Sequence, residues 1–279
     1  DKSTALVWAV DWQNEEMVRL LLAAGAKPNT ADIQGATPLI MACELGSPNI
    51  VISLLKSGAN ARAARPDGIS ALALCAGTST PAALAAMIAK GANVNAADPQ
   101  GETPLMWAAA KGNADNVAYL TSHGANVNAV ASKGFTALFF ALRSKDARSP
   151  VILLRAGADA KAVLPADGMS VAQAAVLENN ESFAEMVVAQ GVDLAQHDQQ
   201  GRQLIHVAAA SGDANLVTLL VAKGVDPNVL SQPPASTAPA RRAAPVQVAG
   251  GGGGGGGGGP KGLAIADGAI KAPPATYYA

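Results

Sequence analysis

Apolar residues along the first 229 positions come in short blocks that are arranged in pairs. One such pair is Leu105 to Ala109 and Val117 to Leu120, separated by a polar break at Gly112. Blocks of this length, separated in this way, predict two short helices joined by a tight turn. The same pattern then starts again further along the chain. The sequence therefore predicts a series of helix pairs.

Two sets of glycines mark the spacing of these pairs. The first set is Gly35, Gly68, Gly101, Gly134, Gly168 and Gly201. The second set is Gly25, Gly58, Gly91, Gly124, Gly157, Gly191 and Gly224. Successive members are 33 residues apart, except for one interval of 34 in each set. A fixed period between about 20 and 50 residues is typical of stacked supersecondary units. We therefore expect an elongated stack whose function is binding rather than catalysis.

The residues around the glycines indicate where the helices begin and end. A threonine or serine such as Thr103 follows the first-set glycine and is expected to cap the first helix by accepting a backbone N–H. Pro104 follows in the first turn, where proline has no cost. Each second helix is expected to end at a second-set glycine, which supplies a left-handed residue. Asn or Asp beyond it favours a turn into the next unit.

These motifs strongly resemble the ankyrin repeat family over residues 1–229. The resemblance rests on stretches such as Gly101-Glu-Thr-Pro-Leu-Met-Trp-Ala-Ala109 and Gly124-Ala-Asn-Val-Asn128. It implies an all-α repeat solenoid of seven stacked helix-turn-helix units with short β-hairpin connections and a concave groove. The first unit begins at Thr4 and lacks its hairpin, and the last ends near Asn228 and needs a cap. The histidine usual in the family's first helix is present only as His206.

The composition changes completely at Leu230. Ser231 to Pro245 is rich in proline, ten glycines run from Gly250 to Gly259, and Pro260 to Ala279 follows. Such segments do not form a core by themselves, so residues 230–279 are expected to be an extended low-complexity tail. It would be ordered only against the solenoid or another chain. The glycine run is either native or stands for residues whose side chains could not be identified.

The cysteines and the N-terminus say little about the compartment. Cys43 and Cys75 occupy neighbouring units, which lie roughly 10 Å apart, beyond the Cα separation of about 7 Å that a disulfide tolerates. We therefore expect two buried free thiols. The chain starts at Asp1 without methionine, which fits either a shortened chain or a mature protein after signal cleavage.

Charge and histidine placement argue against nucleic acid, metal and catalysis. The net charge of -1 provides no overall attraction for nucleic acid or an acidic membrane, and no apolar run reaches the roughly 18–20 residues of a membrane span. His123, His197 and His206 sit at unlike positions of the repeat. No zinc spacing or Cys-x-x-Cys-His haem motif occurs. We expect no cofactor, no metal and no enzyme activity.

One position of the repeat forms an apolar stripe that we assign to core packing. Its members are Trp8, Met41, Leu74, Trp107, Phe140 and Val207.

The basic residues of the middle units have acidic residues among them, so they predict a solvated face rather than a polyanion site. They are Arg62, Arg65, Lys133, Arg143, Lys145, Arg148 and Arg155.

Apolar residues at positions expected to face water are the better functional signal. In this family the hairpin tips and the ends of the first helices bind partners, and exposed apolar patches mark interaction surfaces. The predicted partner-binding residues are Trp12, Leu45, Ile69, Glu102, Phe135, Met169, Leu177 and Arg202. The alternative is that neighbouring hairpins cover each other's tips, which leaves only scattered apolar residues.

Two functional hypotheses follow from the sequence. The first is a non-enzymatic protein–protein interaction scaffold that binds a partner through its concave face and hairpin tips, while the tail tethers or wraps a neighbour. The second is an accessory subunit of a bacterial envelope or electron-transfer assembly whose activity lies in other chains, because alanine-rich ankyrin arrays resemble those of envelope proteins associated with c-type cytochromes. The expected location is the bacterial envelope or the extracellular space, with the cytoplasm as the alternative.

Overall fold

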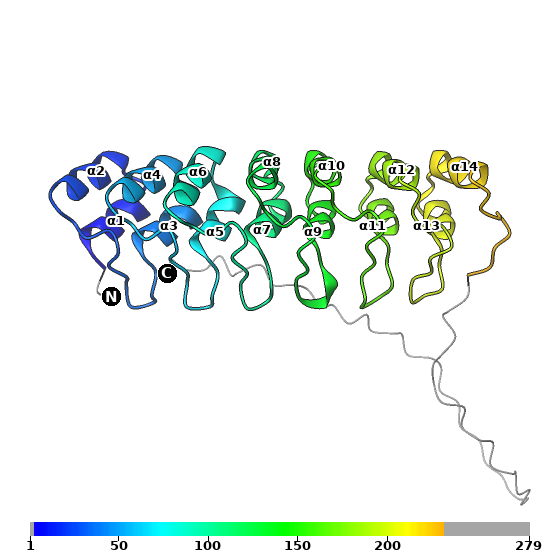
Figure 1. Ribbon diagram of the computed structural model, residues 1–279, viewed down its shortest axis with the longest axis horizontal. Helices are drawn as coiled ribbons and strands as arrows, with labels where there is room; N and C mark the ends of the chain where they lie inside the picture. The colour runs from blue at the N-terminus through cyan, green and yellow to red at the C-terminus, as the bar shows by residue number, and fades with distance from the viewer. Residues whose placement is uncertain (1–2, 232–279) are drawn as a thin grey trace, which may run out of the picture. The chain divides into compact units, whose positions relative to one another are not determined.

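A computed structural model describes residues 3–231, which form seven stacked pairs of antiparallel helices (Figure 1). In each pair the first helix precedes the second along the chain. The first helices are α1 (Ala5–Asp11), α3 (Pro38–Glu44), α5 (Ala71–Thr78), α7 (Pro104–Ala110), α9 (Ala137–Arg143), α11 (Val171–Leu177) and α13 (Leu204–Ser211). The second helices are α2 (Glu15–Ala23), α4 (Pro48–Lys56), α6 (Pro81–Ala89), α8 (Ala114–Ser122), α10 (Arg148–Arg155), α12 (Glu181–Ala189) and α14 (Ala214–Ala222). The predicted all-α solenoid of seven units is confirmed.

The helix ends follow the predicted chemistry closely. The Thr37 side chain accepts from Ile40 N, and Pro38 occupies the first position of α3. Unlike the first helices, several second helices are capped by asparagine or aspartate; Asn113, for example, accepts from Asn116 N at the start of α8. The helices are short, of 7–9 residues, so their stability depends on packing against neighbours more than on propensity.

The connections between the pairs are tight turns rather than paired strands, which corrects the expected β-hairpins. In the described part of the chain the only β-pairing is two isolated bridges, Ala64 with Ser70 and Val163 with Ser170. Each turn is closed by a backbone bond, as from Arg65 N to Ile69 O at 2.9 Å. Figure 1 shows these loops projecting below the two layers of helices. They are called hairpins below.

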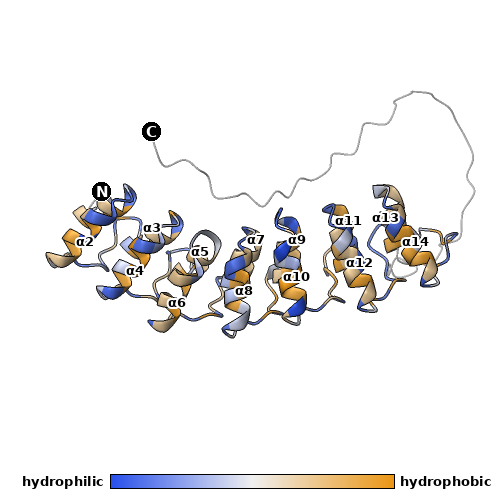
Figure 2. Cartoon of the chain, turned by 90° about the horizontal axis from the view of Figure 1, so that it is seen from above, coloured by the Kyte–Doolittle hydropathy of each residue, from blue (hydrophilic) through white to orange (hydrophobic). Residues whose placement is uncertain are grey.

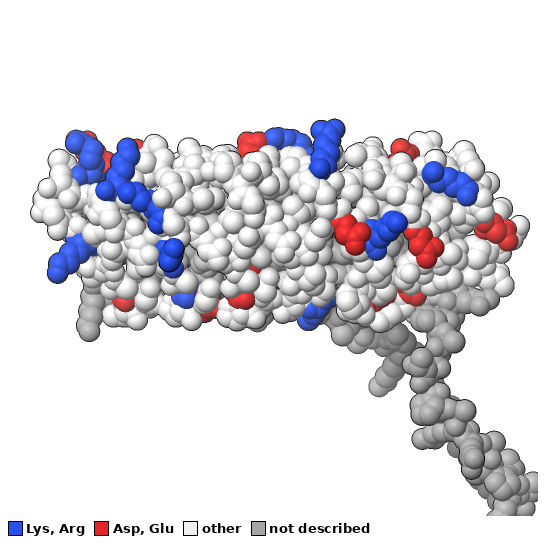
Figure 3. Space-filling view, viewed as in Figure 1, with Lys and Arg blue, Asp and Glu red and all other residues white. Residues whose placement is uncertain are grey.

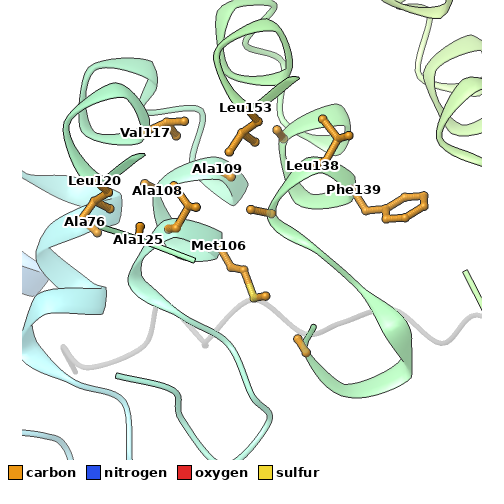
Figure 4. Packing of buried hydrophobic residues seen from close by; sticks show 14 of the residues in the cluster. Ala76, Met106, Ala108, Ala109, Val117, Leu120, Ala125, Leu138, Phe139 and Leu153 are labelled. Carbon is orange, nitrogen blue, oxygen red and sulfur yellow. The ribbon is translucent and has the colours of Figure 1, made fainter. Parts of the chain in front are cut away.

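Small side chains let the helices approach one another. Each first helix packs on its own second helix and on the first helices of the neighbouring pairs. Figure 4 shows Val117 of α8 and Leu153 of α10 directed toward the layer that contains Ala108 and Ala109 of α7. All four are buried. The apolar stripes of the helices (Figure 2) thus form one continuous core along the stack instead of separate cores.

Cys43 and Cys75 form a disulfide, so the expectation of free thiols was wrong. Their Cα atoms are 4.4 Å apart. The spacing of roughly 10 Å between units applies to equivalent positions, but these two cysteines are not equivalent. Cys43 lies on the side of α3 that faces the next unit, and Cys75 lies on the side of α5 that faces back. Their separation of 32, one short of the repeat, was the overlooked signal.

Asparagine side chains link successive turns. Asn95 Nδ2 donates to Gly124 O at 3.0 Å, while Asn95 Oδ1 accepts from Asn126 N at 2.7 Å. Asn128 makes the same two bonds to Gly157 and Asp159 of the following unit. The second asparagine of the Asn-Val-Asn motif therefore fixes its own turn to the next one in the units that carry this motif, in addition to favouring the turn itself.

Substitution of Gly68 by alanine is expected to destabilise the protein more than substitution of Gly58. Both glycines have φ near +90°, a conformation that costs an alanine about 1–2 kcal/mol. A Cβ at Gly68 would lie only 2.6 Å from Pro99 Cδ in the next hairpin, whereas a Cβ at Gly58 would meet nothing within 4 Å. Urea denaturation of the two variants measures the difference, and equal losses would show that the hairpins do not pack as described.

Candidate partner-binding surface

Three of the predicted residues, Trp12, Leu45 and Leu177, are exposed at the ends of the first helices. Trp12 and Leu45 are the residues that terminate α1 and α3, and these two residues are 77% and 37% exposed. Leu177 is the last residue of α11 and is 46% exposed. Trp12 and Leu45 occupy the same position in consecutive units, so they form neighbouring members of one row. Apolar groups of this size gain free energy when a partner covers them.

The predicted hairpin residues lie at the base of the loops rather than at the tips. Ile69, Phe135 and Met169 are half-buried and pack against the core. Phe135 O accepts from Ala131 N at 2.8 Å, and its ring contacts Phe139 and Phe140 with centroid distances of 6.2 and 5.7 Å. The expectation that these positions face water was therefore only partly met, because backbone closure of each loop draws the residue after the glycine inward.

The apolar residues that do project from the loops are Ile33 and Val130, which the sequence analysis missed. They are 65% and 62% exposed. Ile33 stands two residues before Gly35, where the other loops carry Pro66, Pro99, Ser132, Ala166 and Gln199. An isolated isoleucine among turn residues was the signal that could have identified it.

The charged candidates Glu102 and Arg202 share a position but have different surroundings. Arg202 Nε donates to Asp198 Oδ2 at 2.8 Å, and Asp198 is buried. In the equivalent pair of the fourth unit, Asp98 faces another acid, Glu102. Partial burial, followed by the charge of Asp98, raises the pKa of Glu102 above its usual range. A cationic group from a partner would pair with these two acids, as Arg202 pairs with Asp198.

Replacement of Glu102 by glutamine is expected to stabilise the protein at neutral pH by no more than about 1 kcal/mol, because solvent screens a half-buried carboxylate. The folded pKa is raised, so the wild-type penalty is absent below the unfolded pKa and develops as the pH rises through the folded pKa. The gain should therefore vanish in acid. Thermal denaturation at several pH values measures this gain. Glu102→Arg is the variant that introduces a cation beside Asp98, as in the pair of Arg202 with Asp198. A gain that persists in acid would contradict the raised pKa of Glu102.

The histidines have structural partners. His206 accepts from Gln203 N at Nδ1 and donates from Nε2 to Val229 O at 3.1 Å, which ties α13 to the segment that follows α14. The His123 ring stacks on Tyr119 with centroids 3.9 Å apart. His197 Nε2 lies 3.2 Å from Gln203 Nε2. Across residues 3–231, no group of three His, Cys, Asp or Glu side chains is arranged to hold a metal ion.

The basic residues of the middle units are dispersed, as the solvated-face interpretation implies. Arg65 pairs with Glu44 and Asp67, and Arg148 pairs with Asp115 at 2.6 Å. Figure 3 shows isolated charges separated by broad uncharged areas on the face in view. No helix among the described residues is long and apolar enough to cross a membrane.

The geometry defines a helical repeat protein. Several of its exposed apolar side chains lie on the loops and at the ends of the first helices. A family model for ankyrin repeats, described as "Ankyrin repeats (3 copies)", matches residues 1–65, 53–131, 72–149 and 138–231. The chain belongs to the ankyrin repeat family. No curated protein sequence matches it. Ankyrin repeats generally mediate protein–protein interaction and are typically non-enzymatic.

Proposed function

We propose that this chain is a non-enzymatic scaffold that binds another protein through its hairpins and the ends of its first helices. The observation that carries the proposal is the exposure of large apolar side chains at helix ends, above all Trp12 and Leu45 in consecutive units. Aromatic anchors such as Trp12 dominate interface energies, and covering Leu45 adds the free energy of burying its apolar surface. The half-buried Phe135 and Met169 add apolar surface that is held in place by the core.

Rigidity is the mechanism of this proposed binding. The anchors sit on short capped helices and on loops that are hydrogen-bonded to their neighbours, so few groups lose freedom when a partner binds. Glu102 supplies a place for a cation in the partner. The proposed tethering role of the tail concerns residues 232–279, which lie outside the described part of the chain.

Site-specific crosslinking of the full chain tests this proposal. A benzophenone amino acid is placed at Leu45, at Leu177, or at Ala118, an exposed residue in the middle of second helix α8. The proposal expects one protein from the native source to be crosslinked from Leu45 and Leu177 but not from Ala118. Equal crosslinking from Ala118, or none from the two leucines, contradicts it. A partner belonging to a catalytic or electron-transfer complex would favour the accessory-subunit alternative.

We also propose that the protein works in an oxidising compartment such as the bacterial envelope or the extracellular space. The support is the buried disulfide between Cys43 and Cys75, since disulfides persist mainly outside reducing cytoplasm. The test is to denature the protein directly in its native host in the presence of a thiol-alkylating reagent, and to analyse it by mass spectrometry. Cysteines that stay unlabelled in the denatured protein were in the disulfide and support the proposal. Complete labelling would favour the cytoplasm.

A further inference from the structure

The side-chain links between successive turns stop after the fourth helix pair. Asn29 and Arg62 occupy the same position of the repeat as the linking asparagines described above. Each donates to a glycine carbonyl of the following turn, at 3.0 and 2.8 Å. The first four pairs are thus each tied to the next one. Lys161 and Ala195 occupy this position after the fifth and sixth pairs, and neither side chain makes such a bond within residues 3–231.

The junction between the sixth and seventh pairs keeps other polar bonds in place of this link. Gln199 N donates to Asp167 O at 2.7 Å, which joins the two hairpins. Gln173 Nε2 donates to Arg202 O at 2.8 Å, which joins α11 to the next hairpin. The absence of an asparagine therefore does not leave this junction without polar contacts.

The junction between the fifth and sixth pairs has no such replacement. No described hydrogen bond or ion pair joins residues 129–155, which hold the fifth hairpin with α9 and α10, to residues 162–189, which hold the sixth hairpin with α11 and α12. Each of the other five junctions within residues 3–231 carries at least one. Examples are Asn49 with Glu15, Arg65 with Glu44, Asn113 with Ser79, Arg148 with Asp115, and Gln173 with Arg202.

Apolar packing is also weakest at this junction. Of the successive first helices, α9 and α11 pack least closely, and α10 and α12 are the only successive second helices that scarcely meet. The hairpin from Lys161 to Gly168 carries the extra residue of the single 34-residue interval, and its Pro165 lies against Gly134 of the preceding hairpin. The fifth and sixth pairs are therefore held together by fewer contacts of every kind (Figure 1).

We propose that the stack has a hinge at this junction, so that α11 to α14 move as one body against α1 to α10. The stability of a repeat stack is close to a sum of terms for the units and for the interfaces between neighbours. Motion is therefore expected at the interface with the smallest term. A few residues at the ends of helices are enough to absorb the change, and residues 156–161 connect the two bodies.

The hinge divides the surface to which a partner is proposed to bind. Leu45 lies on the first body and Leu177 on the second, so rotation at the hinge changes the separation of these two exposed side chains. A partner that contacts both would select one angle of the hinge. The hinge itself is a property of the free protein and does not depend on that partner.

Distances between pairs of nitroxide spin labels in the full chain, measured by double electron–electron resonance, test the proposal. One pair is attached to cysteines at Ala89 and Ala189 and spans the junction; the control pair, at Ala23 and Ser122, lies within the first body. All four residues are exposed ends of second helices, and each pair spans three units. The native cysteines are bonded to each other and buried. The Ala89–Ala189 distances should be more broadly distributed than the control distances, and equal widths would overturn the hinge.

A single substitution should remove the hinge. Lys161→Asn provides the side chain that can donate to Gly191 O and accept from Asp193 N, as Asn128 does in the preceding unit with Gly157 and Asp159. It should narrow the Ala89–Ala189 distribution to the width of the control. Ala195→Asn makes the corresponding change one junction later and should leave that distribution as it is in the wild type. A distribution that Lys161→Asn leaves broad, or that Ala195→Asn narrows equally, would overturn the proposal.

Discussion

Replacement of Cys43 and Cys75 by alanine together is expected to lower the free energy of unfolding by about 2–4 kcal/mol. The disulfide closes a loop with a sequence separation of 32, and such a cross-link restricts the unfolded chain. Packing should change little, since the next unit carries an alanine pair at these positions, Ala76 and Ala108, both fully buried. Urea denaturation followed by circular dichroism measures the difference from the oxidised wild type.

Reduction of the wild type provides the control. The reduced protein should unfold close to the double-alanine variant, because both lack the cross-link and differ only in two sulfur atoms. If the oxidised wild type and the variant unfold at the same urea concentration, the disulfide does not contribute as expected. Detection of free thiols in the folded, untreated protein would contradict the pairing itself.

Replacement of Asn116 by aspartate is expected to cost about 3–5 kcal/mol at neutral pH, the range found when a buried charge is left without a partner. Asn116 is fully buried between two units, and its Nδ2 donates to Ala76 O and Ser79 O at 2.9 Å each. An aspartate would direct carboxylate oxygen at these carbonyl oxygens. Chemical denaturation at pH 7 measures the loss.

The pH dependence separates charge from packing in this variant. Burial raises the pKa of an introduced carboxyl, so its penalty is fully present above the folded pKa and fades as the pH falls towards the unfolded value of about 3.9. Asn116→Leu is the uncharged control and should lose about 1–3 kcal/mol at every pH, because Ala76 O becomes unpaired. An aspartate variant with a pH-independent loss would contradict the described environment.

The repeat and its local chemistry could be predicted because they depend on neighbours in sequence. Thr37 caps α3 and Gly68 adopts φ of +90° for reasons contained within a few residues of each. The period of 33 then multiplies one unit into seven. Helix number, order and pairing follow from that pattern alone.

The candidate surface was predicted less completely, since exposure depends on the neighbouring unit. Trp12 and Leu177 were placed on the surface correctly, but Phe135 and Met169 are half-covered, and Ile33 was missed. Hydrogen bonds that close a turn draw the residue after its glycine toward the core. The sequence pattern does not reveal how far that residue is drawn in.

The sequence by itself thus determined the unit, its period and the family, because helix caps, turn glycines and apolar spacing are local properties. Only the tertiary structure decided what meets across the units. It paired Cys43 with Cys75 and placed Asn116 against Ala76. The physical reason is that stacking brings together positions that are not equivalent in the repeat. Their contacts depend on how far each helix is rotated and shifted against the next.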